Sequence, residues 1–303
     1  MRTRPGWFAA WLCLVSAAAA RDIYVNNLDG DDRSLGSRPR AAAGIGGPVA
    51  TISKALRLAE AGDRIVVIDT GQPYRESLSL VGTKHSGSTI RPFIIEGNGA
   101  VLDGTSAVPN GAWKHHLGDV FYFEPLRLGY QQLFLNGHPA VRHPAAPSDV
   151  SLPALAPLEW CLKDGRIYFC VEAGRLPSDY ELACCSLQTG ITLYYVQDVV
   201  IRDLIVQGFH VDGVNSSDAV RSAKFEGLTC RGNGRSGITA AGSSRVEVDD
   251  CRLGNNGASQ LRSEGYSQTQ VFRSQLIGNT APALVYEGGR VTIDGQQMTA
   301  VQP

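Results

Sequence analysis

Apolar and asparagine positions recur at a fixed interval in the last third of the chain. Asn233, Asn256 and Asn279 are 23 residues apart. Three apolar sets keep the same interval: Phe225, Val248 and Val271; Cys230, Leu253 and Leu276; Ile238, Leu261 and Leu284. The interval becomes 24 before these units and 22 after them, which adds Ile201, Val206, Val214, Val291 and Ile293. A repeat of this length with a small apolar set in each unit predicts a solenoid.

Each repeat is predicted to consist of short strands rather than a helix. Val246 and Val248 alternate with polar residues, and Gly, Asn and Asp interrupt the runs. At about 3.3 Å per residue, one repeat makes a coil of three short strands, and stacked coils lie about 4.8 Å apart. An asparagine at one corner can then bond its counterpart in the next coil and the turn backbone. Turns of a β-sandwich are the alternative, but they do not explain the other positions that keep the interval.

The N-terminal part is predicted to begin the same solenoid. Residues 51–62 form an amphipathic pattern whose apolar face is Ile52, Ala55, Leu56 and Ala59, with Gly62 as the C-terminal cap. Strands are predicted over 22–25, 63–68, 74–80, 92–98 and 100–104, with an acidic loop over 26–32.

The repeats 225–233, 248–256 and 271–279 resemble those of right-handed parallel β-helix proteins of the pectin-lyase-like superfamily. The N-terminal order of strand, acidic loop, helix, Gly-Asp and strand is similar to the entry of many secreted polysaccharide-active members. The resemblance implies an all-β solenoid whose N-terminal helix covers the open end of the core. It includes β-helical glycoside hydrolases and polysaccharide lyases, and it says little about function because the fold hosts several activities.

Residues 105–190 break the interval and are predicted to form a β-rich insertion. Strands are expected at 120–123, 132–135 and 167–169 among several prolines. The segments 132–137 and 142–144 resemble an inserted β-rich module of some β-helical glycoside hydrolases. The predicted division is therefore 1–20 targeting segment, 21–104 N-terminal cap and first coils, 105–190 insertion, and 191–303 C-terminal coils.

Residues 1–20 have the pattern of a secretory signal. Arg2 and Arg4 precede an apolar run over 7–15, and small residues fill 16–20. No later stretch is long and apolar enough to span a bilayer. We expect a secreted or periplasmic protein that is not membrane-bound after cleavage; an uncleaved anchor is the alternative.

Charge and cysteine usage narrow the set of partners. The formal net charge is −1 and no basic run stands out, which disfavours nucleic acid. We expect a monomer.

Cys161 and Cys170 flank a predicted hairpin turn in which Cys161 faces Tyr168, and whether the two cysteines bond stays open. Cys230 and Cys251 fit either core packing or a bond. No cysteine has metal-ligand spacing with a histidine, so zinc is not expected.

The repeat register predicts which side chains share a face. If Val214, Ile238, Leu261 and Leu284 point inward, the residues after them point outward. The candidate catalytic residues on that face are Asp212, Arg262, Glu264 and Glu287. The candidate substrate-binding residues on it or near its edges are Asn215, Asp218, Arg235 and Tyr266. The resemblance implies that such a face holds an extended glycan.

Two pairs of carboxylates on this face fit acid–base chemistry. Glu264 and Glu287 are one coil apart, about 5 Å, which suits a retaining glycosidase. Asp212 is two coils from Glu264, about 10 Å, near the upper end for an inverting enzyme. Either pair could divide the roles if burial raised one pKa. Solvated surface charges paired with Arg262 are the alternative.

A lyase or a calcium site is less well supported by the sequence. A lyase needs a base and a cation near the developing carbanion, and Arg262, Arg235 or Lys224 could supply the charge. Asp29, Asp31 and Asp32 could bind Ca²⁺ as a hard-oxygen loop, but the same residues are ordinary in turns. The sequence predicts a protein that binds or cleaves extracellular polysaccharide, with hydrolase ahead of lyase. The alternative is a non-catalytic carbohydrate-binding or surface-structural solenoid.

Overall fold

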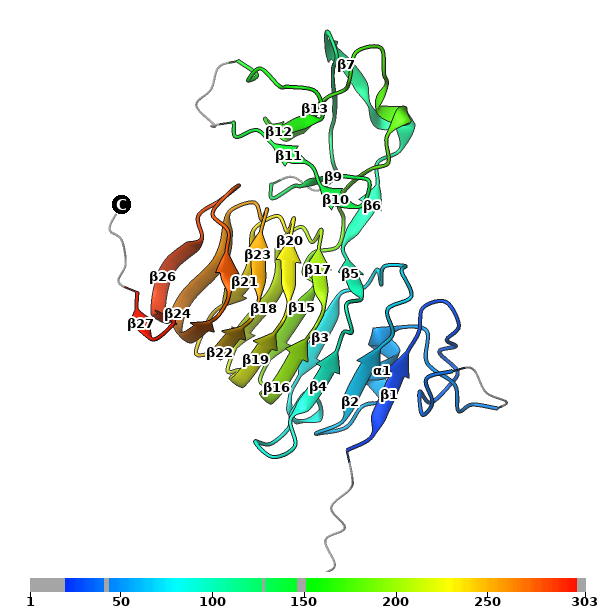
Figure 1. The fold of residues 1–303 in the computed structure, drawn as a ribbon, viewed down its shortest axis with the longest axis vertical. Coiled ribbons are helices and arrows are strands. Elements are labelled where there is room, and N and C mark those ends of the chain that lie inside the picture. The colour runs from blue at the N-terminus through cyan, green and yellow to red at the C-terminus, as the bar shows by residue number, and fades with distance from the viewer. Residues whose placement is uncertain (1–19, 41–43, 127–128, 146–150, 299–303) are drawn as a thin grey trace, which may run out of the picture.

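The computed structural model describes residues 20–40, 44–126, 129–145 and 151–298 (Figure 1). Apart from Ala20, the predicted targeting segment lies outside the described residues. Within the described ranges, no helix is both long and apolar enough to cross a membrane.

The chain winds into a parallel β-helix with three rows of stacked strands. Row A consists of β1 (Asp22–Val25), β2 (Arg64–Val67), β4 (Phe93–Glu96), β16 (Gln197–Arg202), β19 (Arg221–Glu226), β22 (Arg245–Asp249) and the C-terminal parts of β24 (Ser259–Phe272) and β26 (Leu284–Ile293). Row B consists of β3 (Leu78–Val81), β15 (Ile191–Tyr194), β18 (Asp212–Asp218), β21 (Ser236–Ala240) and the N-terminal parts of β24 and β26. Row C consists of β5 (Val101–Asp103), β17 (Ile205–Gln207), β20 (Thr229–Arg231), β23 (Arg252–Gly254) and β25 (Gln275–Leu276). Each full coil therefore passes through rows B, A and C in that order, and β27 (Gln296–Gln297) pairs antiparallel with β26 after the last coil.

Strand pairing follows the predicted register. Phe225 pairs with Val248, and Val248 with Val271, both at the predicted interval. The intervals before and after these coils are also confirmed, because Ile201 pairs with Phe225 and Val271 with Ile293. The inward members of these ladders form one continuous apolar core along the axis.

Two of the three repeated asparagines form a buried ladder at the corner between rows C and B. Asn256 Oδ1 accepts hydrogen bonds from Asn233 N at 3.0 Å and Asn233 Nδ2 at 3.1 Å. Asn256 Nδ2 donates to Cys230 O at 3.1 Å and Gln260 Oε1 at 2.8 Å. Asn279 departs from the prediction: it pairs with Asn255 on the exposed side of the corner, because Gln260 already bonds the inner asparagine.

The N-terminal helix is present but shorter than predicted. α1 spans Ile52–Leu58, and its apolar face is buried as predicted. The Glu76 carboxylate accepts hydrogen bonds from the N–H groups of Ile52 and Ser53, both at 2.9 Å. The helix ends before Gly62 because the Asp63 carboxylate takes the N–H of Glu60 at 2.8 Å, a local bond that competes with helix propagation. α1 packs against β1, β2 and β3, at the N-terminal end of the core.

His85 joins this helix to the strands behind it. It lies in the 3₁₀ turn Thr83–His85. Two further 3₁₀ turns, Asn110–Ala112 and Pro177–Asp179, lie elsewhere in the chain. Its Nδ1 accepts from Val81 N at 2.9 Å, and its Nε2 lies 3.0 Å from Leu56 O. The ring is therefore neutral, with the proton on Nε2. Burial lowers the pKa of His85 below its ordinary value.

We expect the free energy of unfolding to fall as the pH drops from 7.5 to 5.5. Because the pKa of His85 is lower in the folded protein than its unfolded value of about 6.5, protonation favours the unfolded chain below that pH. The stability that the neutral ring contributes is fully present above the pKa of the unfolded state and is lost as the pH falls toward the pKa of the folded state. Urea unfolding at pH 7.5 and at pH 5.5 measures the free energy of unfolding. His85→Gln keeps one hydrogen-bond donor and one acceptor and should make the free energy of unfolding less dependent on pH. An equal pH dependence in the variant and the native chain would contradict the assignment of this effect to His85.

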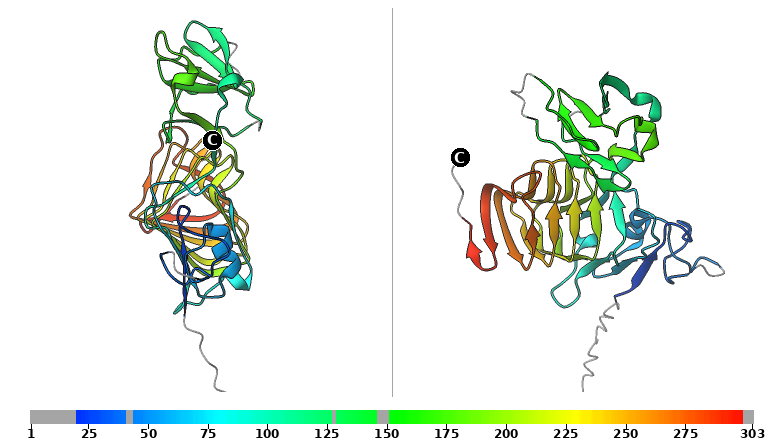
Figure 2. Two further views of the ribbon diagram at one scale, coloured as in Figure 1. Left: turned by 90° about the vertical axis from the view of Figure 1, so that its right-hand side faces the viewer. Right: turned by 45° about the horizontal axis from the view of Figure 1, so that its top comes forward.

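The predicted β-rich insertion is present between β5 and β15. Its nine strands are β6 (Thr105–Ala107), β7 (Lys114–Leu117), β8 (Val120–Phe123), β9 (Leu133–Leu135), β10 (His138–Pro139), β11 (Val141–Arg142), β12 (Glu159–Lys163), β13 (Arg166–Cys170) and β14 (Leu182–Cys185). They form two sheets, ordered β10-β9-β14-β6 and β11-β12-β13-β8-β7. Phe123, Trp160 and Phe169 belong to a separate apolar core there. Both views in Figure 2 show the insertion standing to one side of the coils.

The coils on either side of the insertion pair directly with one another. β3 pairs with β15, β4 with β16 and β5 with β17. The solenoid is therefore continuous in space although its chain is interrupted.

The six cysteines in the described residues are all free thiols. Cys161 faces Tyr168 in the hairpin, as predicted, and Cys170 lies diagonal to it and is not bonded to it. Cys230 and Cys251 are buried in adjacent coils and serve as core residues. Burial raises the pKa of Cys161 to about 11, so its thiol stays protonated at neutral pH.

Candidate functional site

Row B brings six of the eight predicted site residues together. Asp212 opens β18, and Arg235 immediately precedes β21, the strand one coil further on. Arg262 and Glu264 lie on β24, where Glu264 pairs in register with Glu287 of β26. The predicted registers Asn215 to Thr239 and Thr239 to Arg262 are also present. The sequence pattern therefore placed these residues on one strip of the surface.

Asp212 is not exposed, contrary to the expectation of an open face. Its side chain is 0% exposed, and Arg235 covers it with two hydrogen bonds, Nε to Oδ1 at 2.9 Å and Nη2 to Oδ2 at 2.5 Å. Asn215 Nδ2 donates a third at 2.7 Å. Gly213, the next residue, has no room for a side chain, because a Cβ there would lie 2.7 Å from Asn233 Nδ2. The hydrogen bonds to Asp212 raise the pKa of Arg235.

The two glutamates of the strip are linked by Arg262. Arg262 Nη1 lies 3.5 Å from Glu264 Oε1 and 2.5 Å from Glu287 Oε2. Arg235 Nη1 lies 3.7 Å from the same Glu264 oxygen. The Arg262 side chain is mostly buried, whereas the Glu287 side chain is 54% exposed. Two arginines and three carboxylates thus alternate across four coils.

Three neighbouring rungs beside this network carry buried polar atoms that lack a hydrogen-bond partner among the described residues. These atoms are Asn215 Oδ1, Thr239 Oγ1 and Arg262 Nε. They belong to paired positions on β18, β21 and β24. Buried polar groups are rarely left without a partner, so three such atoms on successive strands set this row apart from the rest of row B.

Asp218 and Tyr266 do not join the cluster. Asp218 ends the strand that Asp212 begins, about 20 Å away at 3.3 Å per residue. Its carboxylate accepts from Ser243 N at 3.0 Å and Ala219 N at 2.8 Å, and these bonds lower its pKa, that from Ser243 most. Tyr266 is 87% exposed after the turn at Gly265. Both residues belong to the corner between rows B and A.

The insertion lies against the coils next to Asp212 and Arg235. Gly234 has no room for a side chain, since a Cβ would come 2.1 Å from Tyr130 O. Gly257 also lies against the insertion. A Cβ there would come 2.4 Å from Gln132 Nε2, and Arg142 Nη1 donates a hydrogen bond to the Gly257 carbonyl at 3.1 Å. The insertion therefore borders one end of the strip.

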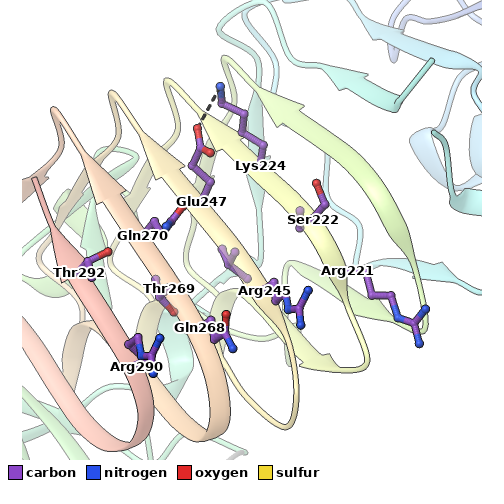
Figure 3. A pocket seen from close by; sticks show the side chains of 12 residues that line it. Arg221, Ser222, Lys224, Arg245, Glu247, Gln268, Thr269, Gln270, Arg290 and Thr292 are labelled. Atoms are coloured by element: carbon purple, nitrogen blue, oxygen red, sulfur yellow. Dashed lines mark ion pairs between the residues drawn. The ribbon is translucent and has the colours of Figure 1, made fainter. Parts of the chain in front are cut away.

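A concave surface that the sequence did not predict lies on row A. A groove of about 400 Å³ runs across β19, β22, β24 and β26 (Figure 3). Arg221, Arg245, Gln268 and Arg290 form one edge of it, and Lys224, Glu247, Gln270 and Thr292 follow in a parallel line. The repeat register already contained this signal, because it aligns Arg245, Gln268 and Arg290 on successive coils.

Two carboxylates of the acidic N-terminal loop bond to other groups of the protein. Asp31 pairs with Arg33 at 2.6 Å, which lowers the pKa of Asp31 to about 2. Asp32 accepts hydrogen bonds from Ala50 N and Thr51 N and from Thr51 Oγ1. Across the described ranges, no three His, Cys, Asp or Glu side chains converge as metal ligands. The loop therefore does not present Asp29, Asp31 and Asp32 as a calcium-ligand cluster.

Comparisons with known proteins agree with the architecture. A family model described as right handed beta helix region matches residues 184–300. No curated protein matches the sequence. A solved structure titled "Glycoside hydrolase" is similar with a TM-score of 0.58 at 13% identity, over 86% of this chain and 74% of that one. Together with the strand pairing, these matches identify the fold as a right-handed parallel β-helix.

Two further solved structures match with lower TM-scores. One is the complex of XylC with xylose, with a TM-score of 0.45 at 12% identity, over 90% of this chain and 69% of that one. The other is pectate lyase Pel9A, with a TM-score of 0.35 at 12% identity, over 91% and 68%.

Proposed function

We propose that this right-handed parallel β-helix is a secreted protein that binds an extracellular polysaccharide along row B and hydrolyses it. The observation that carries the proposal is the pair of in-register glutamates, Glu264 and Glu287, that Arg262 links on row B. A sugar hydroxyl both donates and accepts, so it can bond a carboxylate oxygen or a guanidinium N–H of this strip. Successive rungs are about 4.8 Å apart, close to the length of one pyranose unit in an extended chain.

Glu264 and Glu287 are the proposed reacting pair. Their backbones are in register on adjacent strands, which suits carboxyl groups about 5–5.5 Å apart and a retaining mechanism. In that mechanism one carboxylate attacks the anomeric carbon while the other protonates the leaving oxygen, then activates water. Arg262, which contacts both glutamates, would orient them. Burial behind Arg235 argues against Asp212 as an acid or base, so we assign it the role of positioning Arg235.

Two further observations support a role on polysaccharide outside the cell. Residues 1–20 have the pattern of a secretory signal. The β-helix titled glycoside hydrolase shares the fold, which is an analogy at the level of fold and not of site.

A depolymerisation screen tests the proposal. Purified residues 21–303 are incubated with neutral and acidic polysaccharides, with and without Ca²⁺, and reducing ends and unsaturated uronates are measured. We expect new reducing ends without unsaturated products. Glu264→Gln should lower the rate at least 100-fold, because removal of a reacting carboxylate eliminates a group used in the transition state. Glu60→Gln, an exposed change after α1, is the matched control.

Other outcomes separate the competing functions. Unsaturated products would indicate a lyase, with Arg262 and Arg235 as the cationic groups. Binding without cleavage, in a folded protein, would favour the non-catalytic carbohydrate-binding solenoid. Full activity in Glu264→Gln would contradict the assigned site.

A further inference from the structure

The groove on row A has a column of arginines along one edge. Arg245 pairs in register with Gln268, and Gln268 with Arg290. Arg221 occupies the corresponding place one coil earlier: its N–H bonds to Val196 O, as that of Arg245 bonds to Val220 O. Figure 3 shows these side chains in one line parallel to the axis. The column thus presents three positive charges over four successive coils, about 14 Å at 4.8 Å per coil.

These three guanidinium groups lie apart from the ion pairs of row A. Within the described parts of the chain, none of them forms an ion pair or donates a hydrogen bond. The other cations of row A do have partners: Lys224 contacts Glu226 at 2.9 Å and Glu247 at 3.1 Å, and Arg202 contacts Glu96 at 2.5 Å. Positive charge is therefore left unbalanced along one edge of the groove only.

A second concavity lies on the N-terminal side of Arg221. It has a volume of about 470 Å³ and is lined by Arg221 together with Tyr195 and Gln197. Gln197 pairs with Arg221 in register. The two concavities share Arg221 and together span five coils along the axis, an extent that suits a linear polymer better than a compact ligand.

We propose that this groove binds a linear acidic polysaccharide, whose carboxylate or sulfate groups contact Arg221, Arg245 and Arg290. An arginine fork matches either anion with two parallel hydrogen bonds. The spacing of the coils is close to that of successive sugars, so charges on one side of the polymer can meet charges on one edge of the groove. Gln268 stands between two of the arginines and can bond a sugar hydroxyl.

The observations favour an acidic glycan over a nucleic acid. Proteins that hold single strands usually stack successive bases on several aromatic side chains. The residues that line the groove of Figure 3 include no aromatic side chain, and those that line the neighbouring concavity include one, Tyr195. The overall net charge of −1 gives no general attraction for polyanions. Binding would therefore depend on the local column. This surface lies on a different row from the proposed hydrolytic strip and does not depend on its activity.

Isothermal titration calorimetry with three probes tests the proposal. Polygalacturonate supplies carboxylates, dextran sulfate supplies sulfates, and dextran is neutral; EDTA is present throughout. We expect one or both acidic probes to bind and dextran not to bind at this groove, with affinity falling as salt rises because exposed charges are screened. The triple variant Arg221→Gln, Arg245→Gln, Arg290→Gln should weaken binding at least tenfold. All three side chains are exposed, so the fold should persist, and circular dichroism checks this.

A second triple variant controls for net charge. Arg38→Gln, Arg40→Gln and Arg175→Gln remove three exposed arginines outside the groove and should leave affinity within about twofold. Equal loss in both variants would overturn the proposal, as would binding that needs Ca²⁺, unchanged affinity in the groove variant, or no binding of either acidic probe. Reducing-end release from a neutral polysaccharide should be the same in the groove variant and the native chain, which keeps this test separate from that of row B.

Discussion

Asn256→Ala is expected to lower the free energy of unfolding by about 3 kcal/mol or more. The side chain is completely buried and makes hydrogen bonds to Asn233 and Cys230 of the preceding coil. Its removal leaves Asn233 N–H and Cys230 C=O without this partner, whereas Gln260 Oε1 keeps only the backbone N–H of residue 256. Each unsatisfied buried group costs about 1–3 kcal/mol.

Asn279→Ala provides the matched control. It removes the same side chain at the next corner, where the amide is exposed and bonds Asn255. We expect a loss below about 1 kcal/mol there. Urea unfolding followed by circular dichroism measures both variants. Equal effects would mean that the inner ladder is not what holds the corner.

Asp212→Ala is expected to lower the free energy of unfolding by about 3–5 kcal/mol. The mostly buried Arg235 guanidinium then loses both of its hydrogen bonds to Asp212 and keeps only the Glu264 contact at 3.7 Å. Asp212 accepts two hydrogen bonds from that arginine and one from Asn215. Differential scanning calorimetry of the variant, together with urea unfolding, gives the size of the loss.

A double variant separates the ion pair from packing. Replacing both partners, Asp212→Leu with Arg235→Met, removes the unpaired charge and should recover most of the stability lost in Asp212→Ala. Glu287→Gln removes a charge from the exposed end of the same network and should cost less than about 1 kcal/mol. If the double variant were as unstable as the single one, the pair would not be the source of the effect.

The repeat register was accessible from sequence because every coil buries the same positions. A ladder residue such as Phe225 or Val248 meets its own counterpart in the next coil, so the interval in the sequence is also the pairing in space. The helix at 52–58 was predicted from its apolar face, but its end was not. That end depends on Asp63, which bonds a backbone N–H back in the chain.

The candidate site was only partly accessible for a different reason. The register placed Glu264 beside Glu287 correctly. It did not place Asp212 beneath Arg235, since that burial depends on the Arg235 side chain, which folds over Asp212 from the next coil. The groove on row A was missed although its arginines are in register, because concavity arises from how side chains of several strands leave space between them. The sequence repeat shows which residues are aligned along the axis, but it does not show whether the surface between them is concave.

The insertion holds its own two ends together, which bears on how the coils around it connect. β6 and β14 are its first and last strands, and they pair antiparallel so that Thr105 lies opposite Cys185. The ends of an eighty-residue excursion are therefore held side by side by a unit with its own core. The entropy of closing so long a loop is offset inside that unit. Because β15 then lies next to β3, the stack stays continuous across a pair of strands that are far apart in the sequence.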